Sequence, residues 1–120
     1  MFVSSKERTG TAYMELQYCE KEIPIKDIFK ETGYWKDTSL LIHVDDMDEF
    51  FNIYWEYIEC PISPDGSSRF CHYGLNYYTK ERTEEILKKL KEEKPKDSEI
   101  LAKWLEECVQ KYSGFFILGI

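Results

Sequence analysis

The stretch Gly114-Phe115-Phe116-Ile117-Leu118-Gly119-Ile120 decides the fold, because it is an almost unbroken apolar run. As an exposed segment it would leave its large side chains in water, so it predicts an inner strand of a β-sheet. An inner strand needs neighbours, and three other segments carry the β-branched and aromatic residues that strands prefer. They are 11–18 (TAYMELQY), 39–44 (SLLIHV) and 70–78 (FCHYGLNYY).

Two helices are predicted in the first half of the chain. One covers 24–32, where Pro24 suits the first helical turn and apolar residues recur on one face. The other lies within 45–60, with Asp46 as its N-cap and Glu49 completing a capping box.

Two more helices are predicted in the second half. Thr79 is the expected N-cap of a helix that extends to about residue 93, and the next helix begins at Asp97 or Ser98 and stops at Gly114. The element order is therefore β-α-β-α-β-α-α-β. About four strands in one sheet, with helices packed on it, predict an α+β two-layer sandwich that forms a single domain over 1–120.

The net charge of −7 comes from one part of the chain. Between Asp37 and Ser68 there are eight acids and no Lys or Arg, whereas the remainder carries 16 bases and 15 acids, a balance of +1. Such a surface repels phosphate backbones and attracts cationic partners. The alternative is an ordinary solvated acidic face. We expect no nucleic-acid binding.

The segment 45–60 is apolar over more than one helix face. Either it is sandwiched in the core or its second face docks a partner. Trp55 lies off the main apolar stripe and beside acids, and Trp dominates interface hot spots. The candidate partner-binding residues are therefore Asp45, Asp46, Asp48, Glu49, Trp55, Glu56, Glu59 and Asp65.

Cys71 and His72 are adjacent, which invites a catalytic or metal-binding interpretation. On a regular strand, neighbouring side chains point to opposite faces, so the two cannot act as a pair. The alternation places Cys71, Tyr73, Leu75 and Tyr77 on a core-facing side. It leaves His72, Asn76 and Tyr78 on a polar side, where they could line a ligand site of a small regulatory or ligand-binding domain.

His43 and Asp45 give a second chemical hypothesis, since His-x-Asp on a strand shares one face and could build an acid–base or metal site, with His72 as a further member. A lone strand histidine is more often structural. No phosphate-binding, dinucleotide-binding or nucleophile-elbow motif occurs, so we expect no catalytic residue, no metal, no cofactor and no enzymatic activity.

The composition limits the class of protein. Hydrophobic residues make up 42% of the chain and aromatic residues 16%, which excludes a disordered polymer. There is no apolar run of membrane-spanning or signal-peptide length, so no membrane contact and a cytoplasmic location are expected. The four cysteines have neither C-x-x-C nor zinc-finger spacing, and we expect free thiols.

A small, acidic, aromatic-rich chain without catalytic motifs resembles the immunity proteins of bacterial polymorphic and contact-dependent toxin systems. The stretches that carry the resemblance are DDMDEFFNIYWEYIE, HYGLNYYTKERTEEILKKL and SGFFILGI. It implies binding to a cognate toxin, often a basic nuclease, with acidic residues covering the toxin's working surface. Immunity families differ in fold, so the resemblance assigns no residue roles.

Overall fold

A computed structural model describes residues 1–119. They form a five-stranded sheet in the order β1-β3-β2-β5-β4, with every neighbouring pair antiparallel. The strands are β1 (Phe2–Ser4), β2 (Tyr13–Tyr18), β3 (Leu40–His43), β4 (Leu75–Thr79) and β5 (Gly114–Leu118). The α+β class is confirmed. The expected count of four strands is wrong, because three residues of β1 are too few to show a pattern in the sequence.

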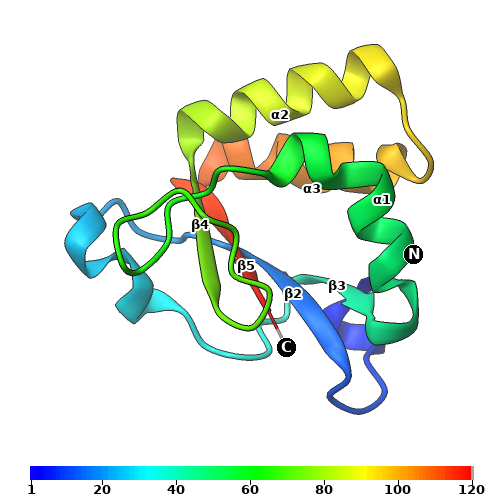
Figure 1. The fold of residues 1–120 in the computed structure, drawn as a ribbon, viewed down its shortest axis with the longest axis horizontal. Helices are drawn as coiled ribbons and strands as arrows, with labels where there is room; N and C mark the ends of the chain where they lie inside the picture. The colour runs from blue at the N-terminus through cyan, green and yellow to red at the C-terminus, as the bar shows by residue number, and fades with distance from the viewer. Residues whose placement is uncertain (120) are drawn as a thin grey trace.

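The α-helices lie together on one side of the sheet, as Figure 1 shows. They are α1 (Met47–Ile58), α2 (Lys80–Glu93) and α3 (Ser98–Lys111). The predicted helix at 24–32 is a 3-10 helix, η2 (Ile25–Glu31), and two shorter 3-10 helices are η1 (Ser5–Glu7) and η3 (Val44–Asp46).

The apolar run at the end of the chain is an inner strand, as predicted: β5 lies between β2 and β4. Phe115 and Ile117 face the helices and join the main core. Phe116 and Leu118 face the other way and pack with Ile28 of η2 in a second cluster. Because both faces of the strand are covered, every one of its residues is apolar.

The second face of the sheet also holds a buried polar network. Glu15 Oε2 accepts hydrogen bonds from Ser39 Oγ (2.5 Å), Gln17 Nε2 (2.9 Å) and Lys36 N (3.2 Å). Gln17 in turn donates to Gly33 O at 2.5 Å. Both Glu15 and Gln17 are fully buried. The network therefore holds the segment 33–39 against the sheet.

The helix caps predicted from the sequence are confirmed only in part. Thr79 Oγ1 accepts from Arg82 N (3.1 Å) and caps α2, as predicted. Asp46 precedes α1, but its side chain makes no capping hydrogen bond, so the expected capping box is wrong. The reason is that η3 leads directly into α1, which gives Asp46 a helical backbone (φ −99°, ψ −1°) instead of the extended one that an N-cap needs.

Candidate functional site

Helix α1 is anchored through its inner face, which frees its outer face for other contacts. Phe50, Tyr54 and Tyr57 are buried in the main core. The Tyr54 hydroxyl donates to Lys96 O and the Tyr57 hydroxyl donates to Glu93 Oε1. Burial raises the pKa of Tyr54 to about 12, so its hydroxyl keeps its proton at neutral pH.

The C-terminal end of α1 is held by α2 and β4. Arg82 Nη2 donates to Glu59 O (2.7 Å) and to Tyr57 O (3.1 Å), where a cation suits the negative end of the helix dipole. The Tyr78 hydroxyl donates to Ile58 O (2.5 Å). These bonds define where the outer face of α1 meets the loop that follows it.

That loop is positioned by a buried side chain of β4. Asn76 Oδ1 accepts from Cys71 N (2.7 Å), and Asn76 Nδ2 donates to Cys71 O (2.9 Å). The same amide nitrogen donates to Ile117 O (3.2 Å) in β5. Because Cys71 is held through both of its backbone groups, its neighbours Phe70 and His72 are placed against α1.

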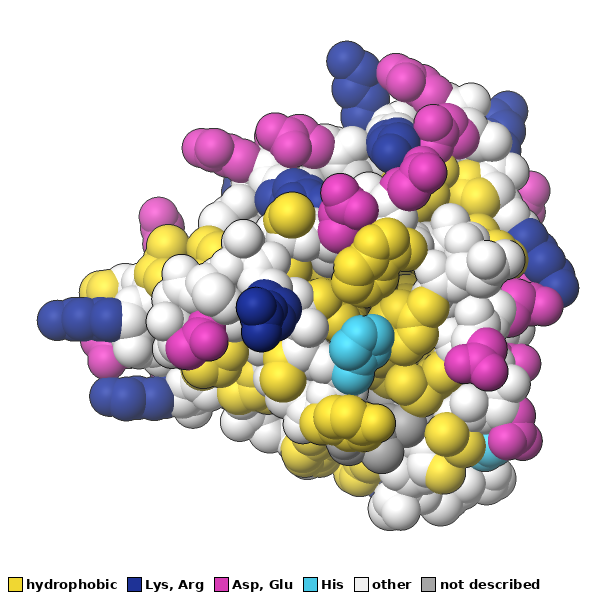
Figure 2. Space-filling view, in the orientation of Figure 1, with side chains coloured by type: hydrophobic (Ala, Val, Ile, Leu, Met, Phe, Trp, Pro, Cys, Tyr) yellow, Lys and Arg dark blue, Asp and Glu magenta, His cyan; other side chains and the backbone are white. Residues whose placement is uncertain are grey.

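The result is an aromatic cluster of four rings, two from α1 and two from the loop: Phe51, Trp55, Phe70 and His72. Their centroids lie 5.0–6.4 Å apart. Phe70 is buried, whereas His72 is exposed and Trp55 is 40% exposed. Figure 2 shows this face, with hydrophobic side chains gathered around a histidine and acidic side chains beyond them. The cluster is thus an apolar surface that solvent reaches.

A hollow of about 470 Å³ adjoins the cluster. Its walls include Phe70 and His72 from the cluster, the 85%-exposed Tyr73, and Asp65 and Arg69 from the same loop. The apolar surface therefore continues beyond α1 and is concave there, which is the shape that receives a side chain of a partner.

The acids of α1 divide into two groups. Asp48, Phe51 and Trp55 follow i, i+3, i+7 spacing and share one side of the helix, and Glu59 follows one turn later. Among the described residues, Asp48 and Glu59 have no ion pair. On other sides of the helix, Glu49 pairs with Lys96 (3.1 Å) and Glu56 pairs with Lys89 (3.7 Å). The unpaired acids therefore flank the aromatic cluster.

The remaining predicted acids lie elsewhere. Asp45 and Asp46 are at the other end of α1, in η3, roughly 18 Å from Ile58 by the rise of a helix of this length. Asp65 lies in the loop, where its Oδ1 accepts from Ser67 N (2.9 Å), and hydrogen bonds from Ser67 lower the pKa of its carboxyl. Asp48 therefore lies one turn before Phe51 and Glu59 one turn after Trp55, at opposite ends of the aromatic cluster, whereas Asp45 and Asp46 lie farther out, beyond Asp48.

The proposed His43–Asp45 pair has a structural role. His43 Nδ1 accepts from Asp45 N (3.1 Å) and lies 3.4 Å from Asp45 Oδ2, so it caps η3. Within residues 1–119 no third His, Cys, Asp or Glu joins them in a group that could hold a metal ion. His72 belongs to the aromatic cluster instead.

The predicted strand at 70–78 begins only at Leu75. The alternation of buried and exposed side chains that was expected from residue 70 onward is therefore wrong. Cys71 and Tyr73, expected in the core, are exposed. Asn76 and Tyr78, expected on a polar surface with His72, are buried. Residues 70–74 leave the strand because the Asn76 side chain, and not a partner strand, takes up the backbone groups of Cys71. Both faces of β4 are covered, since Tyr78 packs in the main core and Tyr77 in the second cluster. The hypothetical ligand site lined by His72, Asn76 and Tyr78 is therefore not formed.

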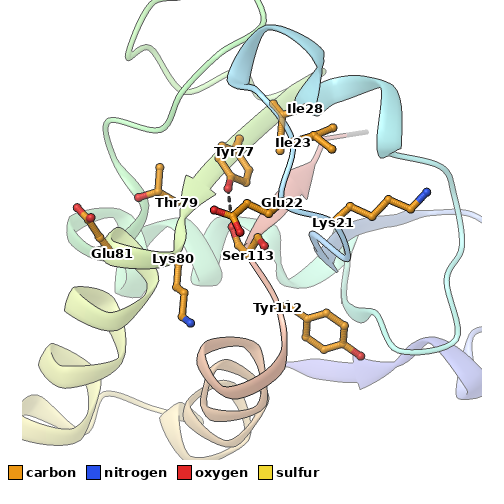
Figure 3. Close-up of a pocket in the computed structure, with 10 residues that line it drawn as sticks. All are labelled: Lys21, Glu22, Ile23, Ile28, Tyr77, Thr79, Lys80, Glu81, Tyr112 and Ser113. Atoms are coloured by element: carbon orange, nitrogen blue, oxygen red, sulfur yellow. Dashed lines mark hydrogen bonds between the residues drawn. The ribbon is translucent and has the colours of Figure 1, made fainter.

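A second hollow of about 410 Å³ lies between η2 and the start of α2, as shown in Figure 3. The Tyr77 hydroxyl, which faces it, donates to Ser113 O (2.5 Å). The rim carries Lys21 and Lys80 but also two glutamates, so it lacks the single sign of charge that would select an ionic ligand.

Phe51, Phe70 and His72 were not among the predicted partner-binding residues. Phe51 could have been found, because it precedes Trp55 by four residues on a predicted helix. Phe70 and His72 reach α1 only through the hydrogen bonds of Asn76, which no local pattern encodes.

No protein-family model matches this chain, and neither does any curated protein or solved structure. None of the helices in the described chain is long and apolar enough to span a bilayer. The function has to be inferred from the chemistry of the surface around α1.

Proposed function

We propose that this chain is a non-catalytic binding protein that docks a cationic protein partner on the outer face of α1. The observation that supports this most directly is the exposed aromatic cluster with Asp48 and Glu59 beside it. Apolar patches rimmed by polar groups are typical of interaction sites, and Trp is the most enriched hot-spot residue. Trp55 is the expected anchor.

The unpaired acids indicate that the partner's binding surface is positively charged. Asp48 and Glu59, two of the acids that make the net charge −7, create a local negative field at the cluster. Such a field speeds association with basic proteins and disfavours acidic ones and nucleic acids. The aromatic cluster supplies the affinity and the acidic rim supplies the selection.

The more specific form of the proposal is immunity against a basic, nuclease-like toxin, to which the resemblance of the sequence points. In that role the protein acts in the cytoplasm, where its four free thiols stay reduced. An acidic surface with an aromatic anchor would cover the basic substrate-binding surface of such a toxin.

The binding proposal is tested with a matched pair of baits. The wild-type protein and a Trp55→Ala/His72→Ala variant are immobilised and exposed to a lysate of the native cell, and the retained proteins are compared by mass spectrometry. Both substituted side chains are exposed, so the variant is expected to fold, which circular dichroism checks. We expect a basic protein that the wild-type bait retains and the variant loses.

If both baits retain the same proteins, the aromatic cluster is not the interface and the proposal fails. The immunity form has its own test, because the retained protein is then expressed in a bacterial host with and without this chain. Growth that is arrested by the partner alone and restored by co-expression supports immunity. A partner without toxicity leaves a binding protein of another kind and refutes the immunity form.

A further inference from the structure

The outer edge of the aromatic cluster consists of Trp55 and His72. Six centroid distances between 5.0 and 6.4 Å are too similar for four rings in one plane, so the rings form a rough tetrahedron. Phe70 is buried and Phe51 is half-buried, which places them on the inner edge. Trp55 and His72 are the two rings that a partner meets first.

These two outer rings are parallel but do not cover each other. Their planes differ by 1° and their centroids are 6.2 Å apart, against 4.1 Å for the stacked pair Tyr18–Trp104. If the rings were separated by about 3.5 Å, the usual contact distance, they would be offset sideways by roughly 5 Å. With a smaller sideways offset, the two ring planes would lie farther apart than the contact distance, with a gap between them. In both arrangements a large part of each ring face is left uncovered by the other ring.

Three of the chain's own cations lie over other aromatic rings. Arg8 lies over Trp35 and Lys89 over Tyr57, each at 4.8 Å from the ring centroid, and Arg82 lies 6.0 Å from the centroid of Tyr78. In the part of the chain that the structure describes, no Lys or Arg lies over a ring of the aromatic cluster. The faces of Trp55 and His72 are thus π surfaces without an internal cation, and the unpaired Asp48 and Glu59 lie at the two ends of the cluster.

We infer that the partner presents an arginine side chain to the facing rings of Trp55 and His72. This inference rests on the proposed function, since it uses the same surface and the same cationic partner. A guanidinium is planar and weakly hydrated and stacks on ring faces, whereas an ammonium is a compact and strongly hydrated point charge. Two parallel rings suit the planar group. Asp48, two turns before Trp55, and Glu59, one turn after it, attract this cation through their negative charge.

The test uses two capped tripeptides, acetyl-Gly-Arg-Gly-amide and its lysine counterpart, titrated into the isotope-labelled protein and followed by NMR. We expect the arginine peptide to shift the Trp55 indole N–H and the His72 ring C–H signals saturably. Its affinity should exceed that of the lysine peptide by about threefold or more, the size of an exposed cation–π preference. The indole signals of Trp35 and Trp104 should stay in place.

Two variants make the result specific. Trp55→Leu should abolish the response of His72, whereas Tyr34→Ala, which removes a 59%-exposed ring that belongs to neither the cluster nor the adjoining hollow, should preserve it. Equal affinities for the two peptides, or no response at Trp55 and His72, would overturn the arginine inference and leave the binding surface standing. If instead the wild-type and variant baits retain the same proteins, the proposed function fails whatever the peptides do.

Discussion

Lys96 Nζ lies 3.1 Å from Glu49 Oε1, so a base from the connection between α2 and α3 neutralises one acid of the base-free segment. Lys89 of α2 does the same for Glu56, at 3.7 Å. The hydrogen bond that Lys96 donates to Glu49 also raises the pKa of Lys96, which keeps that base charged. The acidic surface that the charge count suggests is therefore smaller by two charges in the folded protein, and Asp48 and Glu59 are the acids next to the aromatic cluster that keep their full charge effect.

This division gives a prediction with an internal control. With the partner that the wild-type bait retains, Asp48→Asn/Glu59→Gln should weaken binding by about tenfold, because no base of the chain compensates these two charges. Glu49→Gln/Glu56→Gln removes the same charge from already paired positions and should change affinity by no more than about twofold. Calorimetric titrations at about 50 mM and about 300 mM NaCl measure both, and only the first variant should lose salt dependence. Equal losses in the two variants would mean that net charge alone attracts the partner.

Local patterns predicted most of the fold. The apolar run of β5, the amphipathic spacing of α2 and α3 and the cap at Thr79 are confirmed because each depends on a few neighbouring residues. The start of the strand at 70–78 was placed too early, because the backbone groups of Cys71 bond to the Asn76 side chain.

The site was predicted less completely for the same reason. Trp55 stands out in the sequence as an aromatic residue off the core-facing stripe of a helix, and the structure leaves it 40% exposed. The loop residues Phe70 and His72 join it through tertiary hydrogen bonds, because Asn76 of β4 holds the backbone of Cys71 between them. The pairing of Glu49 and Glu56 with lysines is likewise tertiary, since the two bases come from distant parts of the chain.

The buried Glu15 gives a second prediction. Its Oε2 accepts three hydrogen bonds, whereas Oε1 has no partner in the described structure. Glu15→Gln can present its carbonyl oxygen at the Oε2 position, so it should change the free energy of unfolding by less than about 1 kcal/mol. Glu15→Ala leaves several buried donors unpaired and should cost about 3 kcal/mol. Urea unfolding measures both variants. If Glu15→Gln lost as much free energy of unfolding as Glu15→Ala, the charge of the carboxylate would be essential to the network.

Gly114 gives a third prediction, since it begins β5 with φ at +113° and lies against β4. A Cβ at this position would lie 2.1 Å from Tyr78 O, so Gly114→Ala combines backbone strain with a clash against main chain. We expect a loss of about 3 kcal/mol or more in the free energy of unfolding. The matched control is Gly33→Ala, where a Cβ meets nothing within 4 Å. It should stay within about 0.5 kcal/mol of wild type in the same urea titration. A tolerated Gly114→Ala would show that β4 and β5 can separate at this edge.

The buried hydroxyls and thiols predict that stability falls at alkaline pH. Burial raises the pKa of Tyr54 and of Cys108 to about 12, and it raises the pKa of Tyr18, Tyr57, Tyr77 and Tyr78. In the unfolded chain a thiol ionises near pH 8.5 and a phenol near pH 10. Between those values and about pH 12 the unfolded state therefore binds fewer protons than the folded state, and the free energy of unfolding falls as pH rises.

We expect stability to be flat from about pH 7 to 8 and to fall progressively from about pH 9 upward, as measured by urea unfolding at successive pH values. Tyr54→Phe loses the hydrogen bond to Lys96 O, so it should be less stable at neutral pH. The free energy of unfolding of this variant should nevertheless fall less steeply above about pH 10, because one titrating hydroxyl has been removed. Tyr73→Phe, in contrast, removes a hydroxyl from an 85%-exposed residue and should leave the slope unchanged. A slope that is the same in all three proteins would mean that Tyr54 can reach water in the folded state, which would contradict its burial on the inner face of α1.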